Sequence, residues 1–304
     1  MKNKASGDYK LKLGYRMRQS SVSYVMIAPF FAFFIFFTVL PVLAAILLSF
    51  TDFNMLQFPG FVGLENYQRL ILDDEIFILA LKNTLTLAII NGPLSYLASF
   101  LMAWLINEMP KHLRVLMTLI FYAPSISGNI YFIWTFLFSG DAYGYINGML
   151  LNWGIINEPV LWFNDPSTAM FIVILVQFWT SLGTSFLAFI AGFQSVDKGL
   201  YEAAAIDGVH NRFEELWYVT IPSMKEMLLF GAVMQISGTF SVGAVTDALT
   251  GGASSVAGST LTIINHMGDY GGVRYEMGYA CAISVVLFAM VYLSKKVIFR
   301  LLKW

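Results

Sequence analysis

The chain has 304 residues, of which 58% are hydrophobic and only 12% are charged, and its formal net charge is −1. Soluble domains carry about 25% charged residues, so this composition, with a mean hydropathy of +0.68, excludes a water-soluble globule and predicts a protein whose apolar surface faces lipid. No basic cluster beyond the termini indicates nucleic-acid binding. The single cysteine, Cys281, excludes an internal disulfide framework and a paired-cysteine metal site.

Six apolar runs are long enough to cross a bilayer, which takes about 17–25 residues in a helix. We therefore predict an all-α, polytopic membrane protein with six transmembrane helices. Two further uncharged runs, 142–157 and 248–268, are interrupted by Gly, Asn, Ser or Thr and are predicted to be loops that are partly re-entrant. The predicted spans are 19–51, 83–107, 115–140, 166–196, 227–246 and 277–294.

Lys and Arg residues are distributed unevenly between the two faces that this topology defines. With the N-terminus inside, the other face keeps only Arg69, Lys82 and Arg274 of the 18 basic residues. Because basic residues accumulate on the cytoplasmic side of a membrane, both termini are predicted to be cytoplasmic. The loop between the fourth and fifth spans, 195–222, then lies in the cytoplasm as well.

The first apolar run, 22–50, is far longer than the 7–15-residue core of a signal peptide and is predicted to be an uncleaved anchor. Pro29 and Pro41 predict kinks in it. The predicted segments in chain order are a cytoplasmic tail 1–20, a first span 21–50, an extracytoplasmic segment 51–82, a transmembrane core of five helices 83–299 that includes the loop 195–222, and a cytoplasmic tail 300–304.

Charged residues on the extracytoplasmic side do not form a recognisable catalytic or metal site. The acidic run 73–75 is interpreted as a solvated helix start, because it lacks the further ligands that a metal ion needs. His266 and Asp269 have no nucleophile at a suitable spacing. Arg274 and Glu276 are expected to form ion pairs at the rim of the protein.

Neutral polar side chains recur inside three of the spans. The third span contains proline, serine and glycine, which predicts a bend in the membrane. In the fourth and fifth spans, polar residues recur at spacings of three and four, which puts them on one helical face. Such a face turns inward, either to hold helices or a second subunit together or to line a passage for an uncharged polyol. The candidate passage residues are Asn129, Gln177, Ser181, Ser185, Gln235 and Thr239.

The cytoplasmic loop between the fourth and fifth spans is a polar island that predicts two short helices. Asp197 is expected to cap the first helix, and Gly208 is expected to stop it. Asn211, with Glu214 three residues later, is typical of a capping box that starts the second helix. Pro222 is expected to end that helix and to stand in the first turn of the next.

This loop resembles the EAA loop of binding-protein-dependent ABC importers, and in particular that of the carbohydrate permeases of the MalF/UgpA group. The similarity lies in the Glu-Ala-Ala run 202–204, in Gly208 and in the Thr-Ile-Pro run 220–222. Isoleucine stands where leucine is usual before the proline, and the proline is one residue further from the glycine than in the commonest version of the motif. The stretches 63–67 and 274–279 extend the resemblance over nearly the whole chain.

The resemblance implies a permease subunit of an ABC importer for a sugar or oligosaccharide, in a bacterial-type cell membrane. It implies three kinds of partner, namely a second homologous permease subunit, two ATPase subunits and an extracytoplasmic solute-binding protein. The residues that it implies for coupling to the ATPase are Glu202, Ala203, Ala204, Asp207, Gly208 and Pro222.

No Walker lysine motif occurs in the chain, so ATP is expected to be used by the partner ATPase, and no cofactor, metal or catalytic residue is expected here. The alternative is a self-sufficient secondary transporter or channel for a neutral solute. Ion coupling or a charged filter requires an ionisable residue inside the membrane, and the predicted spans lack one.

Overall fold

The structure is a computed structural model, which describes residues 21–128 and 130–301. Within these residues the regular elements are helical, apart from one isolated bridge between Thr51 and Phe61. The all-α prediction is confirmed for this part of the chain. Five helices or broken helices are long and apolar enough to cross a membrane, and a sixth is present if α6 (Lys111–Ile126) and α7 (Tyr131–Leu137) form one bent span.

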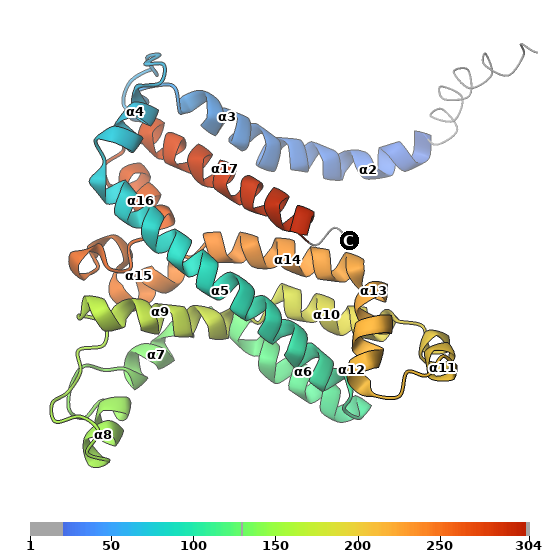
Figure 1. The fold of residues 1–304 in the computed structure, drawn as a ribbon. Helices are drawn as coiled ribbons and strands as arrows, with labels where there is room; N and C mark the ends of the chain where they lie inside the picture. Colours follow the sequence, from blue (N-terminus) through green and yellow to red (C-terminus); the bar gives the residue numbers. More distant parts are fainter. Residues whose placement is uncertain (1–20, 129, 302–304) are drawn as a thin grey trace, which may run out of the picture.

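The first span stands apart from the rest of the bundle (Figure 1). It consists of α2 (Ser21–Phe34), a π turn (Ile35–Val39) and α3 (Leu40–Leu48), and only its α3 part lies along α17 (Met277–Leu301). The π turn lies between the two prolines that predicted kinks. This span exposes a row of aromatic side chains, as expected of a helix that meets lipid or another membrane chain: Phe30, Phe31, Phe33, Phe34, Phe36 and Phe37.

The second span is longer than the sequence predicted. Its helix, α5 (Glu75–Asn107), has 33 residues and starts eight residues before the expected position. Asp74 caps it by accepting a hydrogen bond from the Phe77 N–H at 2.8 Å. The predicted helix start at the acidic run is therefore confirmed, but the prediction that this run is solvated is wrong for Asp74, which is 8% exposed. The last span, α17, also extends beyond its predicted end.

The third, fourth and fifth spans are interrupted. α6 and α7 meet at an angle of 86°. α9 (Pro166–Thr180) is separated from α10 (Thr184–Ser195), and α14 (Lys225–Phe240) is separated from α15 (Ala244–Thr250), by three residues in each case. The bend predicted in the third span is confirmed. The prediction that polar residues of the fourth span share one helical face is wrong, because the helix stops between them.

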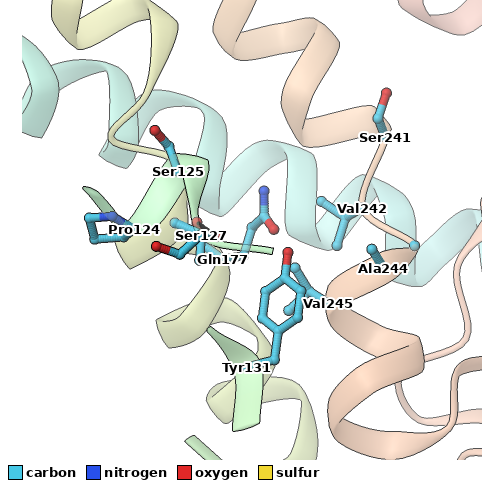
Figure 2. Close-up of a pocket in the computed structure, with 11 residues that line it drawn as sticks. Pro124, Ser125, Ser127, Tyr131, Gln177, Ser241, Val242, Ala244 and Val245 are labelled. Atoms are coloured by element: carbon cyan, nitrogen blue, oxygen red, sulfur yellow. Dashed lines mark hydrogen bonds between the residues drawn. The ribbon is translucent and has the colours of Figure 1, made fainter. Parts of the chain in front are cut away.

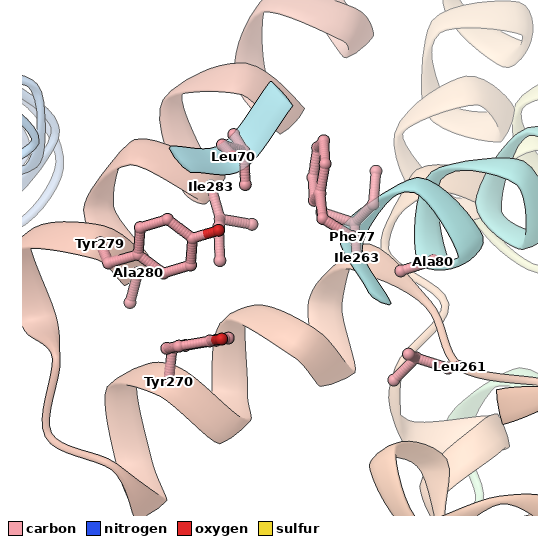
Figure 3. Packing of buried hydrophobic residues seen from close by; sticks show 9 residues of the cluster. All are labelled: Leu70, Phe77, Ala80, Leu261, Ile263, Tyr270, Tyr279, Ala280 and Ile283. Atoms are coloured by element: carbon pink, nitrogen blue, oxygen red, sulfur yellow. The ribbon is translucent and has the colours of Figure 1, made fainter. Parts of the chain in front are cut away.

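Four short elements gather at one end of the bundle, called the α16 end below (Figure 1). They are α4 (Glu65–Leu72), α8 (Tyr145–Asn152), α16 (Ile263–Gly268) and a π turn (Asp269–Val273). The loop predicted at 248–268 folds inward, since α16 is buried against α5 and α17. Figure 3 shows the apolar cluster that holds this end together: Leu70, Phe77, Ala80, Leu261, Ile263, Tyr270, Tyr279, Ala280 and Ile283.

The buried carboxylate of Asp74 links three segments of the chain at the same end. Asp74 Oδ2 accepts hydrogen bonds from Tyr279 Oη at 2.6 Å and from His266 Nε2 at 2.8 Å. Beside it, Arg69 pairs with Glu276 at 2.5 Å and lies over the Tyr279 ring at 4.2 Å. His266 thus pairs with Asp74 and not with a residue of its own loop.

Ion pairs form at the rim as expected from the sequence. Arg274 pairs with Asp269 at 2.7 Å, and Glu276 pairs with Arg69. No group of three or more metal-ligating side chains occurs in the described residues.

Candidate functional site

Three helix breaks meet around a polar cavity in the middle of the bundle. The cavity has a volume of about 220 Å³ and is bordered by the end of α6, by α9 and by the 241–245 segment between α14 and α15. Figure 2 shows Ser127, Tyr131 and Gln177 around this space, opposite Val242 and Val245. A second cavity of about 200 Å³ shares part of this lining and continues along α10 and α14.

Four of the predicted passage residues lie at these cavities. Gln177 lines both of them, and Ser181, Ser185 and Gln235 line the second. Ser185 Oγ donates a hydrogen bond to Gln235 Oε1 at 3.0 Å, and both side chains are buried. The structure therefore unites residues of two different spans, although the single helical face expected for the fourth span does not exist.

The other two predicted residues are placed differently. Thr239 lines neither cavity; its hydroxyl donates to the Gln235 carbonyl at 2.7 Å, and it borders an apolar groove between α5 and α14. Asn129 lies outside the described residues. The sequence prediction missed Ser125, Thr180 and Ser241, which line the cavities because they stand next to helix breaks. Hydrophobic periodicity carried no signal for the position of those breaks.

The cavities offer neutral hydrogen-bonding groups. Thr180, Ser181 and Ser241 donate their hydroxyl protons to carbonyls of the preceding helical turn, at 2.7–3.0 Å, so their oxygens remain free to accept. The Gln177 carboxamide makes no hydrogen bond within the described residues, and it can both donate and accept. No Asp, Glu, Lys or Arg occurs among the described residues that line either cavity.

The break in the fourth span also allows two interrupted spans to approach closely. Gly183 stands at the start of α10, where the end of α6 comes close: a Cβ at this position would lie 3.2 Å from Ser125 Cβ. A side chain at this position would be tighter than usual against Ser125, so glycine favours the close approach of the two spans, and the hydroxyl of Ser125 lies at the second cavity.

The loop 195–222 forms the predicted pair of helices at the opposite end of the bundle. Asp197 caps α11 (Lys198–Ile206) by accepting a hydrogen bond from the Gly199 N–H at 3.0 Å. The helix ends as a Schellman motif, with the Val209 N–H donating to the Ala204 carbonyl, and Gly208 adopts a φ of +94°. The predicted start and stop of the first helix are confirmed.

The second helix starts after Asn211 as predicted, but the capping box is incomplete and the helix end differs from the prediction. Asn211 Oδ1 accepts from the Glu214 N–H at 2.9 Å as expected, but the Glu214 carboxylate accepts from the His210 N–H and not from the capping residue itself. Pro222 does not end the helix. The chain continues through α12 (Arg212–Glu214), a π turn (Glu215–Thr220) and α13 (Ile221–Ser223), and breaks only at Met224.

A π turn lies in the segment between Gly208 and Pro222, where the sequence has one residue more than the commonest version of the motif. Its hydrogen bonds span five residues instead of four, so one turn takes up one additional residue without rotating the helix beyond it. Deleting the exposed Tyr218 is expected to convert this turn to α-helix and to leave expression and transport within about twofold of wild type. Deleting Ile206 in α11, where no π turn absorbs the change, is the control and is expected to abolish transport. Equal losses of transport in the two deletion variants would contradict the conclusion that the π turn takes up one additional residue.

The helix pair, called the hairpin below, is attached to the end of α5. Arg212 pairs with Glu215 at 2.7 Å and with Glu108 at 3.5 Å, and Phe213 packs edge-on against Trp104 with ring centres 5.3 Å apart. The hydrogen bond to Glu215 and the charge of Glu108 raise the pKa of the Arg212 guanidinium. No sequence pattern indicated this link between the hairpin and α5.

The candidate coupling residues lie on the outside of the hairpin. Glu202 and Ala203 are exposed, Ala204 is half-buried, and Asp207 is the exposed C-cap of α11. Several large apolar side chains are exposed beside them, including Ile206 at 87%. This surface combines small residues, exposed carboxylates and uncovered apolar side chains, which is the composition of a protein-binding surface.

Comparison with known proteins identifies the family. Residues 95–300 match the family described as "Binding-protein-dependent transport system inner membrane component". The arabinooligosaccharide permease protein AraP of Halalkalibacterium halodurans is 31% identical over 90% of this chain and 85% of its own. The trehalose/maltose permease protein MalF of Thermococcus litoralis is 26% identical over 94% and 97%.

A solved structure shares the fold. A chain of a bacterial ABC transporter involved in the import of the acidic polysaccharide alginate superimposes with a TM-score of 0.72, at 23% identity, over 95% of this chain and 99% of its own. The resemblance to the MalF/UgpA group is confirmed. The chain is a multi-pass membrane protein and belongs to the family of inner-membrane components of binding-protein-dependent transport systems.

Proposed function

We propose that this chain is one of two homologous permease subunits of an ABC importer, and that the pair encloses a passage for a neutral sugar or oligosaccharide in a bacterial-type plasma membrane. The observation that carries the substrate class is the cavity at the three helix breaks, which is lined by hydroxyls and a free carboxamide and has no charged side chain among its described lining residues. Interrupted membrane helices commonly form solute sites near the middle of the bilayer.

Each cavity residue has a distinct role in this proposal. Gln177 binds sugar hydroxyls directly, because its carboxamide is unpaired in the described chain. Ser181 contributes an acceptor oxygen. Ser185 orients the Gln235 side chain by donating a hydrogen bond to its Oε1. The Thr239 hydroxyl donates to the backbone carbonyl of Gln235. Asn129, which lies outside the described residues, is proposed as a further passage residue on its sequence position alone.

The hairpin is proposed to dock into a partner ATPase, which binds and hydrolyses ATP while this chain binds no cofactor. Glu202 supplies a polar contact, and Ala203 and Ala204 allow close approach. Gly208 sets the turn between Asp207 and the second helix. Pro222 stiffens the last turn of the hairpin. The exposed side chain of Ile206 becomes buried against the ATPase.

The topology that fits this function has both tails, 1–20 and 300–304, and the loop 195–222 on the cytoplasmic side. The segment 51–82 and the α16 end are extracytoplasmic and face a solute-binding protein. The distribution of Lys and Arg supports this orientation. The start of α2, the end of α17 and the hairpin lie toward the same end of the bundle in Figure 1, which is consistent with it.

Movement of the hairpin is proposed to open and close the passage. The hairpin follows α10 in the chain and precedes α14, and its contacts from Arg212 and Phe213 reach the end of α5. A displacement imposed by the ATPase therefore acts on three spans at once, and alternating access results from their motion against the rest of the bundle.

Purified complexes reconstituted in liposomes test the proposal. The wild type is expected to co-purify with an ATPase and to take up at least one member of a panel of tritiated neutral disaccharides and trisaccharides only when ATP is present. Gln177→Leu is expected to lower that uptake at least tenfold, since the lost hydrogen bonds cost about 1.5 kcal/mol or more. Thr86→Val, which removes a hydroxyl that lines neither cavity and, within the described residues, bonds only the Lys82 carbonyl, is the control and keeps wild-type uptake. Uptake by the chain alone without ATP would support a secondary transporter instead.

A further inference from the structure

Three polar side chains of α5 are buried without a hydrogen-bond partner. Asn91, Ser95 and Ser99 are each 0% exposed, and neither the carboxamide atoms of Asn91 nor the two hydroxyls find a partner in the described part of the chain. Their spacing of four residues puts them one above another on a single face of the helix. They form a line, called the α5 stripe below, that leads from the middle of α5 toward its end at Asn107.

The same helix satisfies its other buried polar side chains. Asn83 Nδ2 donates to the carbonyls of Gly258 at 2.9 Å and Leu261 at 3.0 Å. Thr84 Oγ1 accepts from the Ile263 N–H at 3.0 Å. The half of α5 near the α16 end therefore pairs its buried polar groups, and the missing hydrogen bonds are confined to the α5 stripe.

The half of α5 that carries the α5 stripe packs against mainly apolar side chains of the neighbouring helices. α5 packs against α10 through aromatic rings, where Phe189 meets Tyr96 edge-on at 5.3 Å and Phe100 edge-on at 5.7 Å. It also packs against α14, where Tyr96 Oη donates to the Leu228 carbonyl at 3.2 Å. An unpaired buried polar group destabilises the arrangement that buries it, because its hydrogen bonds to water are lost and not replaced. Nearly all buried polar groups in native proteins have a hydrogen-bond partner. Three unpaired groups in one line therefore indicate a second conformation in which they are paired.

We propose that the α5 stripe is a section of the passage wall that α10 and α14 cover in this structure, and that it becomes wetted when α5 separates from them during the transport cycle. The inference rests on the proposed transport function. Water satisfies Asn91, Ser95 and Ser99 in the open arrangement, which lowers the free energy of that arrangement relative to the closed one. The unpaired groups thus keep the two arrangements close in free energy.

The contacts at the end of α5 supply the means of opening. Glu108 follows the last residue of the helix and pairs with Arg212 of the hairpin, and Trp104 packs against Phe213. A movement of the hairpin therefore pulls on the half of α5 that carries the stripe. The outer half is held at the α16 end by the hydrogen bonds of Asn83 and Thr84.

Thermal unfolding of the purified complex gives the first test, with two matched variants on one helix. Asn91→Leu removes an unpaired carboxamide and is expected to raise Tm by about 2–4 °C. It is also expected to slow ATP-driven uptake at least tenfold, because it favours the closed arrangement. Asn83→Leu removes two hydrogen bonds and is expected to lower Tm. A fall of Tm in Asn91→Leu like that of Asn83→Leu, or a rise without any loss of uptake, would overturn the proposal.

Thiol labelling gives the second test. In a Cys281→Ser background, Ser95→Cys is expected to react with a positively charged methanethiosulfonate at rates that differ at least tenfold between the nucleotide-free complex and the complex trapped with ATP and vanadate. Ala80→Cys, buried near the α16 end, is the control that labels in neither state. Equal rates for Ser95→Cys in both states contradict the proposal. If no ATPase assembles with the wild type, the transport function fails, while the Tm comparison still decides whether the α5 stripe is unpaired.

Discussion

Replacing Gly208 by valine is expected to abolish ATP-driven transport while the chain still inserts and is expressed at the wild-type level. Gly208 has a φ of +94°, and a β-branched residue held there costs about 1–3 kcal/mol of backbone strain. The space around the residue is open, because no neighbouring atom lies within 4 Å of the point where a Cβ would stand, so crowding plays no part. Relief of this strain reorients α11 relative to the second helix, and the hairpin no longer fits a preformed partner surface.

Liposome uptake and ATP hydrolysis, measured on the same preparations, check this expectation. Uptake by Gly208→Val is expected to fall more than tenfold, and hydrolysis is expected to become independent of uptake. Gly208→Asn is expected to recover part of the activity, because asparagine tolerates a positive φ. Gly199→Ala is the matched control on the same hairpin; its φ lies outside the left-handed region and its neighbours leave ordinary contact distances. Normal uptake by Gly208→Val would show that the turn at Gly208 does not couple this chain to the ATPase.

Removing the Asp74 carboxylate is expected to produce the largest loss of stability. Asp74→Ala leaves the Phe77 N–H, the Tyr279 hydroxyl and His266 Nε2 without their acceptor at a buried site. Breaking such a buried pair costs about 3–5 kcal/mol. We expect Tm of the purified complex to fall by at least about 5 °C. Asp73→Ala, which removes the exposed neighbouring carboxylate, is the control and is expected to leave Tm unchanged.

The dependence of this effect on pH follows from the ionised state of the carboxylate. Burial by itself would raise the pKa of Asp74, but hydrogen bonds from Tyr279, from the Phe77 N–H and from His266 hold that pKa below its usual value. The usual value is about 3.9. The stabilisation is therefore fully present above about pH 4 and is lost as the pH falls through the lower, folded value. The Tm difference between wild type and Asp74→Asn should be constant near neutral pH and shrink below about pH 4. A difference that grows in acid would contradict this assignment.

Local chemistry made the hairpin predictable in detail. Asp197, Gly208 and Asn211 act on N–H groups or backbone angles within a few residues of themselves, so their roles depend little on the rest of the fold. The prediction that Pro222 ends the second helix is wrong, but its predicted place in the first turn of a helix is confirmed, because it stands in the first turn of α13. The π turn that precedes it depends on how the hairpin docks, and hydrophobic periodicity carries no information about it.

The passage residues were predicted by type but not by geometry. Gln177, Ser181 and Ser185 were assigned to a common helical face, whereas the helix breaks at 181–183, between Gln177 and Ser185. At this break the end of α6 comes close to Gly183, a contact between residues nearly sixty positions apart that no local pattern encodes. The same holds for His266, which pairs with Asp74 and not with its neighbour Asp269.

Composition and short-range chemistry were enough to establish the membrane class and the number of apolar runs, because each of these depends on residues close together in the chain. The orientation and the coupling role of the loop 195–222 stay predictions from the same local patterns. Long-range packing set where the helices break, which polar side chains converge and which remain unpaired. Those outcomes require that distant segments meet: the cavity at Gln177, the hydrogen-bond cluster at Asp74 and the α5 stripe at Asn91 each exist only where two or more spans come into contact.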